Sequence, residues 1–279
     1  MRILVTGANG MIGAHLVKEL VDSKYDVIGI DRDSARFNND RYFHQQVDLA
    51  DKNELYNIVM NYKPDRIIHL AALAHAVDGK KYTWENYKHL NVECAKNVFD
   101  VAGEIPILFI STVDVFGFTD DIVNANTPMK PVSDYGKSKM IAELEVCKKK
   151  YFDIFRLSPV YTDAIKRDIQ KRYYLKYPNI AYQVGKGTEY EILNVKKAVK
   201  EMVAWCARKP QNTVKIIKDE QKMWTPDYIK NEKMNGRAKI VIWIPYKLVR
   251  IVYVCLKWIT GENKYTYLLN KVVNPLKSE

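Results

Sequence analysis

Thr6-Gly7-Ala8-Asn9-Gly10-Met11-Ile12-Gly13, close to the start of the chain, decides the fold. This stretch follows residues 2–6, an apolar run typical of a strand, and opens residues 12–20, where apolar residues recur at helical spacing. The first glycine can make a tight turn, the second leaves room for a pyrophosphate, and the third lets the helix pack closely on the sheet. The helix N-terminus would offer free N–H groups to phosphates. We therefore prefer a dinucleotide-binding loop to the alternative, a simple turn.

An acidic residue ends the second strand-like run, residues 26–30. Asp31 lies eighteen residues after Gly13. A carboxylate at this place would bind the two ribose hydroxyls of NAD and repel the 2′-phosphate of NADP. Arg32 follows directly, and its guanidinium could hold that phosphate instead. We expect NAD as the cofactor, with NADP as the less favoured alternative.

Strand and helix patterns alternate through the first half of the chain. The strand-like runs are 65–70, 105–110 and 154–157, and the helical patterns are 53–61, 87–102 and 138–151. This alternation predicts an α/β fold, a doubly wound parallel sheet of the Rossmann type with helices on both faces. We expect an NAD-binding domain over residues 1–160. A smaller, partly interwoven substrate domain over 161–279 is expected to fold over the C-terminal edge of the sheet.

The composition narrows the class of protein. The chain has 279 residues, 47% of them hydrophobic and 28% charged, an ordinary globular balance. Its four cysteines form no C-x-x-C pair, which is typical of a reduced intracellular protein, and its five histidines form no metal-binding cluster. Met1-Arg2 leads directly into the first apolar run, unlike a secretion signal. We therefore expect a cytoplasmic protein without a metal.

The net charge of +11 has three possible explanations. Nucleic acid is one, but no helix-turn-helix, zinc-finger or aromatic RNA-binding signature accompanies the charge, so we expect no nucleic-acid partner. A small anionic substrate such as a diphosphate is the second. An anionic membrane surface is the third.

Tyr135 and Lys139 lie four residues apart at the start of a helical pattern, so they share one helix face. A tyrosine normally ionises near pH 10. An adjacent ammonium and a positive nicotinamide ring would favour the phenolate, which gives a general base near neutral pH. The spacing alone is also that of an ordinary surface pair, and the glycine loop upstream makes the catalytic interpretation more specific.

A hydroxyl group follows the all-apolar strand 105–110. At the end of that strand, Ser111 or Thr112 would point into the crevice where open α/β sheets bind ligands. We prefer Thr112 for this role. The alternative is that both residues only end the strand.

These motifs together resemble the extended short-chain dehydrogenase/reductase family of nucleotide-sugar epimerases and dehydratases. The stretch 6–13 fits the family's T-G-x-x-G-x-x-G, and Tyr135 to Lys139 fits its Y-x-x-x-K. Val115-Phe116-Gly117 stands where the family has V-Y-G, which selects Thr112 as the catalytic hydroxyl. Further matches to family motifs are His69-Leu70-Ala71-Ala72, Asp48-Leu49, Asn91-Val92 and residues 156–161.

The resemblance implies contacts for the cofactor and for the substrate. The expected cofactor contacts are Gly7, Asn9, Gly10, Met11, Ile12, Gly13, Asp31, Arg32, Asp48, Leu49, Leu70, Ala71, Ala72, Asn91, Tyr135, Lys139 and Pro159. The expected substrate contacts are Ala74, His75, Asp114 and Arg172, although a structural role for His75 is an equal alternative.

The resemblance also implies a reaction on a sugar that is joined to a nucleotide diphosphate. Tyr135 would take the proton from a sugar hydroxyl, usually at C4, while hydride moves to the nicotinamide. Thr112 would bind the same oxygen, and Lys139 would hold the nicotinamide ribose. An epimerase then returns the hydride to the other face of the ketone, a dehydratase first loses water, and a reductase stops at one transfer.

Departures from the family pattern rank these reactions. Val113-Asp114 stands where sugar dehydratases carry Asp-Glu, so dehydration is disfavoured. Phe116 stands where the family usually has the tyrosine of its V-Y-G motif. Pro159 stands where many members have an asparagine that binds the substrate. We expect an NAD-dependent C4 epimerase of a nucleotide sugar for polysaccharide biosynthesis. The alternatives are a 4-keto-sugar reductase and, in another class, a non-catalytic dinucleotide-binding sensor or membrane-associated scaffold.

Residues 239–259 begin with Lys239 and are otherwise almost wholly apolar apart from Lys247, Arg250 and Lys257. We predict a helix here and consider three neighbours for it: the core of the second domain, an anionic membrane surface at the inner face of the membrane, or a second copy in a homodimer. Pro245 and the central cations argue against a membrane span. A second basic group (Lys166, Arg167, Lys171 and Arg172) is either a diphosphate site or a solvated helix face.

Overall fold

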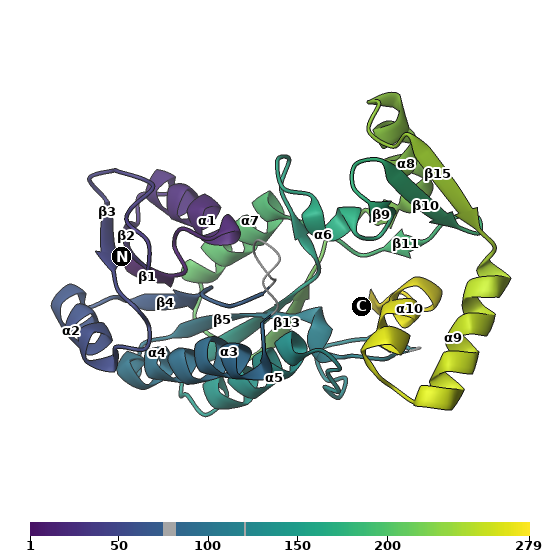
Figure 1. Cartoon of the computed structure of the whole chain (residues 1–279). Helices are drawn as coiled ribbons and strands as arrows, with labels where there is room; N and C mark the ends of the chain where they lie inside the picture. Colours follow the sequence, from purple (N-terminus) through teal and green to yellow (C-terminus); the bar gives the residue numbers. More distant parts are fainter. Residues whose placement is uncertain (75–81, 120) are drawn as a thin grey trace. The chain divides into compact units, whose positions relative to one another are not determined.

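A seven-stranded sheet forms the frame of the first of two units into which the chain divides (Figure 1). The computed structural model describes residues 1–74, 82–119 and 121–279. The strand order is β13 (Val214–Ile217), β7 (Phe152–Leu157), β5 (Ile107–Thr112), β4 (Arg66–His69), β1 (Arg2–Thr6), β2 (Asp26–Asp31) and β3 (Tyr42–Gln46). All neighbouring pairs from β3 to β7 are parallel. The chain order reverses between β1 and β4, and open α/β sheets bind ligands at such a point.

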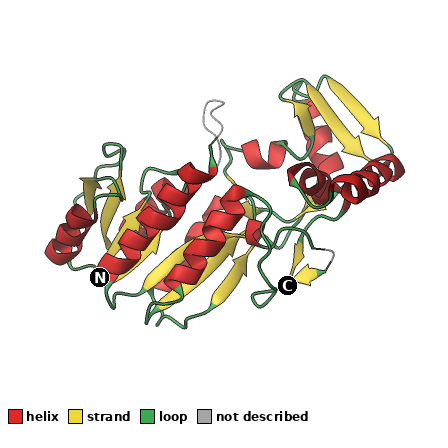
Figure 2. Ribbon diagram, turned by 60° about the horizontal axis from the view of Figure 1, so that its bottom comes forward, coloured by secondary structure: helices red, strands yellow, loops and turns green. Residues whose placement is uncertain are grey.

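Helices cover both faces of this sheet (Figures 1 and 2). On one face α1 (Met11–Asp22) packs against α7 (Val195–Cys206). On the other, α4 (Ala95–Ala102) lies between α2 (Lys52–Tyr62) and α5 (Asp134–Val146). A short helix α3 (Trp84–Lys88) and a π-helical turn η1 (His89–Cys94) lead into α4.

The central strands are apolar throughout because both of their faces are covered. Ile3, Leu4 and Val5 of β1 are at most 1% exposed, and β5 is buried from Ile107 to Ser111. The predicted doubly wound parallel sheet is therefore confirmed.

The first unit contains three separate segments of the chain. It comprises Met1–Val115, Asp134–Leu157 and Val195–Lys215, and the second unit comprises Phe116–Ser133, Ser158–Asn194 and Ile216–Glu279. This partition differs from the expected boundary at residue 160. The segment 195–215 belongs with the sheet because α7 buries Ala198, Met202 and Trp205, and because β13 extends the sheet beyond β7.

A three-stranded sheet and several short strand pairs make up the second unit. The sheet has the order β15 (Ile240–Ile244), β10 (Ile180–Val184) and β9 (Tyr174–Lys176). The pairs are β8 (Val160–Tyr161) with β12 (Leu193–Asn194), β11 (Glu189–Tyr190) with β14 (Met223–Trp224), and β6 (Ile122–Val123) with β16 (Lys277–Ser278). Helices α6 (Arg167–Gln170), α8 (Thr225–Met234), α9 (Tyr246–Thr260) and α10 (Lys264–Val273) complete the unit. Its core includes Ile169, Tyr173, Tyr190 and Met223.

The predicted helix over residues 239–259 requires correction. Residues Ile240–Ile244 form strand β15, which pairs in parallel with β10, and α9 begins only at Tyr246. Pro245 separates the two elements at the N-cap of α9, since proline lacks the N–H that a continuing ladder or helix would need. Within the described part of the chain, no helix is long and apolar enough to cross a membrane.

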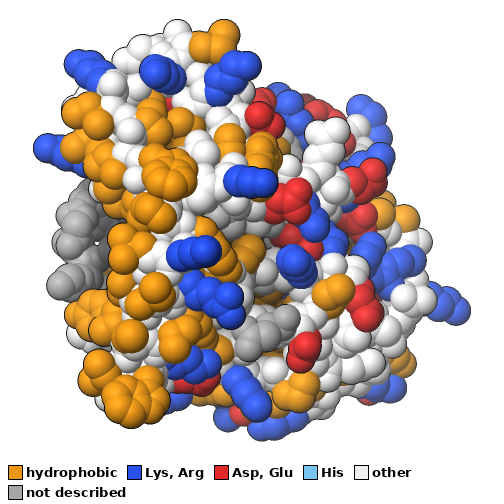
Figure 3. Space-filling view, turned by 90° about the vertical axis from the view of Figure 1, so that its right-hand side faces the viewer, with side chains coloured by type: hydrophobic (Ala, Val, Ile, Leu, Met, Phe, Trp, Pro, Cys, Tyr) orange, Lys and Arg blue, Asp and Glu red, His pale blue; other side chains and the backbone are white. Residues whose placement is uncertain are grey.

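The outer surface of β15 and α9 is strongly apolar. Figure 3 views this side of the molecule, where hydrophobic side chains gather with lysine and arginine side chains between them. Trp243 is 61% exposed, Ile251 60% and Trp258 87%.

Candidate active site

The glycine loop approaches the backbone that follows β4. Gly7 has a φ of +70°, and a Cβ atom at this position would lie 2.8 Å from the backbone nitrogen of Ala71. The backbone nitrogens of Gly7 and Ala8 donate to the carbonyl of Ile30 at the end of β2, at 2.9 and 3.2 Å. Only glycine fits this turn without strain. The loop therefore fixes the place where β1, β2 and β4 end.

The N-terminus of α1 is free of a side-chain cap. Gly10 is the N-cap residue and offers no side chain to bond the first N–H groups of the helix. Its absent Cβ would lie 3.1 Å from the carbonyl oxygen of Gly7. Because uncapped N–H groups and the helix dipole attract anions, the first turn at Met11, Ile12 and Gly13 has the donors that a diphosphate needs.

Asp31 lies beside the glycine loop as predicted. Its carboxylate accepts hydrogen bonds from the backbone nitrogens of Asn9 at 2.9 Å and Asp33 at 3.2 Å. These bonds orient the carboxylate at the end of β2 while leaving it further acceptor capacity. Arg32 is exposed, and its carbonyl accepts from the side chain of Gln46 at 3.1 Å.

Asp48 and Leu49 follow β3 at the edge of the sheet where β2 ends with Asp31. Strand β3 ends beside Asp31, where the backbone nitrogen of Val47 donates to the Asp31 carbonyl at 2.9 Å. The Leu49 carbonyl accepts from the side chain of Asn97 at 3.0 Å. Burial raises the pKa of the Cys94 thiol to about 11, and the nearby Asp48 carboxylate adds to this shift. Asp48 therefore follows directly after a residue that is hydrogen-bonded to Asp31, whose carboxylate binds the glycine loop at Asn9.

His69 connects the ends of β1 and β4. Its Nδ1 lies 2.8 Å from Oγ1 of Thr6, which also accepts from the Ala71 nitrogen at 3.3 Å. The ring stacks on Phe109 and is fully buried. Burial lowers the pKa of His69 to about 3, and the neighbouring Lys139 ammonium adds to this effect. His69 is therefore neutral, and it fixes the segment Leu70–Ala72 beside the glycine loop.

Asn91 joins this same segment to helix α5. Its side-chain oxygen accepts from the Leu73 nitrogen at 2.7 Å, and its amide nitrogen donates to the Leu73 carbonyl at 3.0 Å and to Oγ of Ser138 at 2.9 Å. Ser138 in turn donates to the carbonyl of Tyr135 at 2.8 Å. Both amide hydrogens of Asn91 are thus used inside the protein. The predicted contact of Asn91 with a cofactor stays a prediction, while the bonds give this residue a positioning role.

Tyr135 and Lys139 lie one turn apart near the start of α5, as their spacing predicted. The end of β5, with Thr112, and the following 3-10 turn η2 (Val113–Val115) pack against this helix. Oγ1 of Thr112 accepts from the backbone nitrogen of Asp114 at 3.2 Å, which leaves the hydroxyl hydrogen for another partner. The three predicted catalytic residues and Asp114 therefore come from elements in direct contact.

Lys139 is unusually deep for a lysine. It is only 2% exposed, and its Nζ lies 4.0 Å from the centre of the Phe109 ring. Burial lowers the pKa of Lys139 to about 7, although the Glu143 carboxylate one turn further along α5 opposes this shift. Glu143 is held by Arg156 on β7, with Nη2 to Oε2 at 2.8 Å and Nε to Oε1 at 3.1 Å. This buried pair was not predicted from the sequence, although an acid four residues after Lys139 was a local signal for it.

The remaining predicted site residues belong to other segments of the chain. Pro159 and Arg172 belong to the second unit, where the Arg172 guanidinium lies 4.4 Å from the centre of the Tyr190 ring. His75 lies outside the described residues. Ala74 is partly buried and is the last described residue of the segment after β4.

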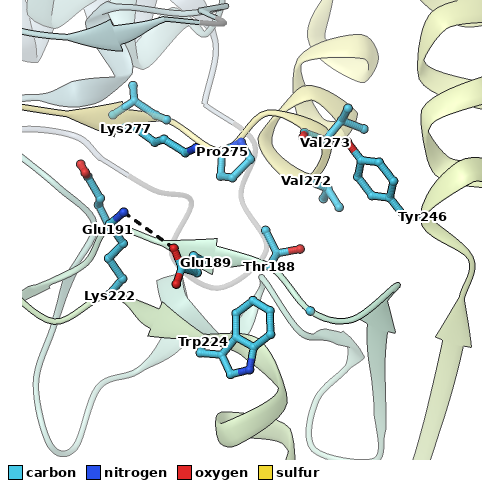
Figure 4. A pocket seen from close by; sticks show the side chains of 12 residues that line it. Thr188, Glu189, Glu191, Lys222, Trp224, Tyr246, Val272, Val273, Pro275 and Lys277 are labelled. Atoms are coloured by element: carbon cyan, nitrogen blue, oxygen red, sulfur yellow. Dashed lines mark hydrogen bonds and ion pairs between the residues drawn. The ribbon is translucent and has the colours of Figure 1, made fainter.

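The second unit has a pocket of its own with a volume of about 310 Å³. In Figure 4, Trp224 and Thr188 line one side, while Val273, Pro275 and Tyr246 line the other. Lys222 and Glu189 form an ion pair at 3.7 Å within its wall.

Comparison with known proteins identifies the family. The model of the NAD dependent epimerase/dehydratase family matches residues 3–194. The chain belongs to this family. The resemblance inferred from the glycine loop and the Tyr135–Lys139 spacing is thereby confirmed.

Relatives with different names each match about half of this chain. A dTDP-glucose 4,6-dehydratase of Haemophilus influenzae is 33% identical over 164 residues, which cover 50% of this chain and 48% of the relative. The methionine adenosyltransferase 2 subunit beta of Danio rerio is 30% identical over 145 residues, 52% of this chain and 43% of the relative. The chain thus matches about half the length of these relatives.

A solved structure of a UDP-glucuronic acid 4-epimerase from Bacillus cereus, in complex with NAD, is similar over a longer range. The TM-score is 0.71 at 22% identity, and the alignment covers 88% of each chain. At this identity the similarity establishes the fold.

Proposed function

We propose that this protein is an NAD-dependent epimerase of a nucleotide sugar. The observation that carries the proposal is the packing of α5, with Tyr135 and Lys139, against the end of β5, with Thr112. This cluster belongs to the same unit as the glycine loop and Asp31. A base, a hydroxyl donor and a dinucleotide loop in one unit are the parts required for oxidation and re-reduction of an alcohol.

NAD fits the residues of the first unit. Gly7 and Gly10 let the loop fold closely on the protein backbone, where a Cβ atom would crowd Ala71 and the Gly7 carbonyl, and the uncapped start of α1 supplies donors for the diphosphate. The Asp31 carboxylate would accept from the adenosine ribose, and its charge disfavours the extra phosphate of NADP. When bound, NAD would supply the chemistry of accepting a hydride and giving it back.

Side chains of this protein would transfer the proton of the sugar hydroxyl. Tyr135 as the phenolate takes the proton from the C4 hydroxyl of the sugar and later returns it. Thr112 donates its hydroxyl hydrogen to the same sugar oxygen and so keeps it within reach of Tyr135. A protonated Lys139, one turn away, favours the phenolate of Tyr135 through its positive charge. Because the pKa of Lys139 lies at about 7, its charge responds to small changes in the site.

Epimerisation is preferred over dehydration on a local feature. The turn η2 after Thr112 carries Val113 and Asp114, without the second acid that would expel water. The name of the Bacillus cereus neighbour, a 4-epimerase solved with NAD, supports the same choice. A 4-keto-sugar reductase would use the same residues and stops after one hydride transfer. The Danio rerio relative is named as a subunit of an adenosyltransferase, which keeps a non-catalytic dinucleotide-binding role as the alternative of another class.

The first experiment follows the near-ultraviolet absorbance of NADH in purified protein given UDP-, GDP- and dTDP-sugars. An epimerase should reach a sugar equilibrium with only transient reduction of NAD. A reductase should consume added NADH in proportion to a keto-sugar. No response to any sugar would favour the non-catalytic alternative.

The mechanism is tested with Tyr135→Phe, which removes the phenolic oxygen alone. We expect turnover to fall by a factor of about 10²–10⁴ while NAD binding, measured by calorimetry, is kept. Tyr87→Phe is a matched control, because the Tyr87 ring lies 6.3 Å from that of Tyr135 but has no proposed role. Full turnover in Tyr135→Phe would contradict the assignment.

Two partner proposals concern the whole chain. We propose a nucleotide-diphosphate sugar as the substrate. The contacts of Ala74, Asp114 and Arg172 with this substrate stay predictions. We also propose that the enzyme works in the cytoplasm as a peripheral membrane protein. A homodimer is the competing way to cover the apolar segment.

A further inference from the structure

Helix α9 presents apolar side chains to solvent on the side away from its own packing partner. It packs against α10 through Tyr253, whose hydroxyl donates to Oδ1 of Asn270 at 3.0 Å. Tyr253 is the single buried residue of α9. The opposite side carries the exposed residues Leu248, Ile251, Val252, Val254, Cys255, Trp258 and Ile259. A helix surrounded by water has polar residues on that side, so α9 is suited to an apolar neighbour.

Strand β15 continues the same kind of surface. It lies at the edge of its sheet and, among the strands of the described residues, pairs with β10 alone. Ile240 is 55% exposed and Trp243 61%, so both apolar and aromatic side chains of the strand reach solvent. Proteins usually protect such an edge with charges, proline or a covering element. We call the exposed residues of β15 and α9 together the apolar face.

The charges of the apolar face are all of one sign. Residues 239–260 contain Lys239, Lys247, Arg250 and Lys257 and no acidic residue. Lys257 pairs with Glu262 at 3.0 Å. Lys247 and Arg250 are exposed and form no ion pair with any residue that the structure describes. A neighbour of this face would therefore need negative charge around apolar groups.

A second copy of the chain is a poor match for this need. In a two-fold dimer the same surface meets itself, so Lys247 and Arg250 would find only apolar groups or other cations among residues 239–260 of the second copy, and no acid. An anionic lipid surface offers the opposite charge together with an apolar interior. The exposed Trp243, Tyr246 and Trp258 also suit the boundary between headgroups and acyl chains, where tryptophan and tyrosine concentrate.

We propose that β15 and α9 dock this protein on a membrane surface that carries anionic lipids. Helix α9 lies in the plane of the headgroups, because its 15 residues are fewer than the roughly 20 that a span requires. Lys247 and Arg250 contact lipid phosphates, while Ile251 and Trp258 enter the acyl region. This docking goes beyond the proposed reaction and does not depend on it.

The test is sedimentation of the full-length protein with vesicles of phosphatidylcholine alone or with added phosphatidylglycerol. We expect retention to rise on the order of ten-fold or more on the anionic vesicles and to fall as salt is raised. Ile251→Gln with Trp258→Gln, and separately Lys247→Glu with Arg250→Glu, should each lower retention at least about ten-fold. All four side chains are exposed, so the fold is expected to tolerate these changes.

Matched controls come from the first unit. Tyr56→Gln with Met60→Gln removes two exposed apolar side chains of α2, and Lys18→Glu with Lys96→Glu reverses two exposed cations. Both control proteins should bind anionic vesicles like the wild type. Equal retention on neutral vesicles, or retention that neither α9 variant changes, would overturn the proposal.

The oligomeric state of the protein distinguishes the membrane from a second copy of the chain as the neighbour of the apolar face. A wild-type dimer that both α9 variants convert to a monomer, without vesicle binding, would assign the apolar face to a second copy. Turnover of soluble nucleotide sugars is measured for every variant in parallel. Lost vesicle binding with full turnover supports docking, and absent turnover concerns only the proposed reaction.

Discussion

His69 is a titratable side chain enclosed in the first unit. With a pKa of about 3 it stays neutral in the folded protein, whereas an unfolded histidine gains a proton below about pH 6.5. Between these values the unfolded chain binds more protons than the folded one. Stability therefore rises with pH across this window and is lost as the pH falls from about 6.5 towards 3.

We predict a flatter acid profile for His69→Leu. At pH 5 the wild type should have lost about 2 kcal/mol through this residue, at 1.36 kcal/mol for each pH unit below the unfolded pKa. The variant is less stable at pH 7, because Thr6 loses its partner, yet it should lose less on acidification. Urea titrations at pH 7, 6 and 5 measure both slopes. If the free energy of unfolding fell equally with pH in the wild type and the variant, His69 would not be the source of the acid sensitivity. His15→Gln, at an exposed position of α1, is the control.

The positions of single residues could be predicted where a fixed motif ties a residue type to one place in the fold, while their chemistry stays a prediction. Gly7, Asp31 and the Tyr135–Lys139 pair belong to this class. The partners of Asn91 could not be predicted, because Leu73 and Ser138 are 18 and 47 residues away in the chain. Hydrogen bonds between such distant segments follow from the tertiary packing and leave no local pattern.

Helix α5 is anchored as an element by the buried pair of Glu143 with Arg156 on β7. We predict that Glu143→Ala lowers the free energy of unfolding by about 3–5 kcal/mol, because it leaves the buried guanidinium uncompensated. Replacing both residues, as Glu143→Leu with Arg156→Met, should cost less. Chemical denaturation compares the two proteins. A double variant that is no better than the single one would show that packing, rather than the charge, is responsible.

Elements were predicted well where both faces are buried and poorly at the edges. The run 2–6 became β1 without change, and 53–61 lies within α2. Strand β3 was missed because its sequence, Tyr-Phe-His-Gln-Gln, is largely polar at the edge of the sheet. Residues 239–259 were assigned to one helix because an apolar run has no clear period, and Pro245 was interpreted only as an obstacle to a membrane span.

At the scale of the whole molecule, the chain alternates between the two units. The chain passes from one unit to the other five times, at the ends of the six segments. We predict that a fragment of residues 1–160 does not fold, because it lacks α7 and β13. Trp205 of α7 is fully buried and donates from Nε1 to Oδ2 of Asp153 at 2.8 Å. Circular dichroism and thermal unfolding of the fragment and the full chain test this expectation. A cooperative transition in the fragment would contradict it.

The late position of β13 has a consequence for synthesis on the ribosome. Strand β7 ends at Leu157, but its neighbour begins only at Val214, 57 residues later. At about 5–20 residues per second, the nascent sheet waits several seconds with the outer edge of β7 unpaired. The codons between these two strands therefore set how long an apolar strand edge is open to chaperones or to a neighbouring nascent chain.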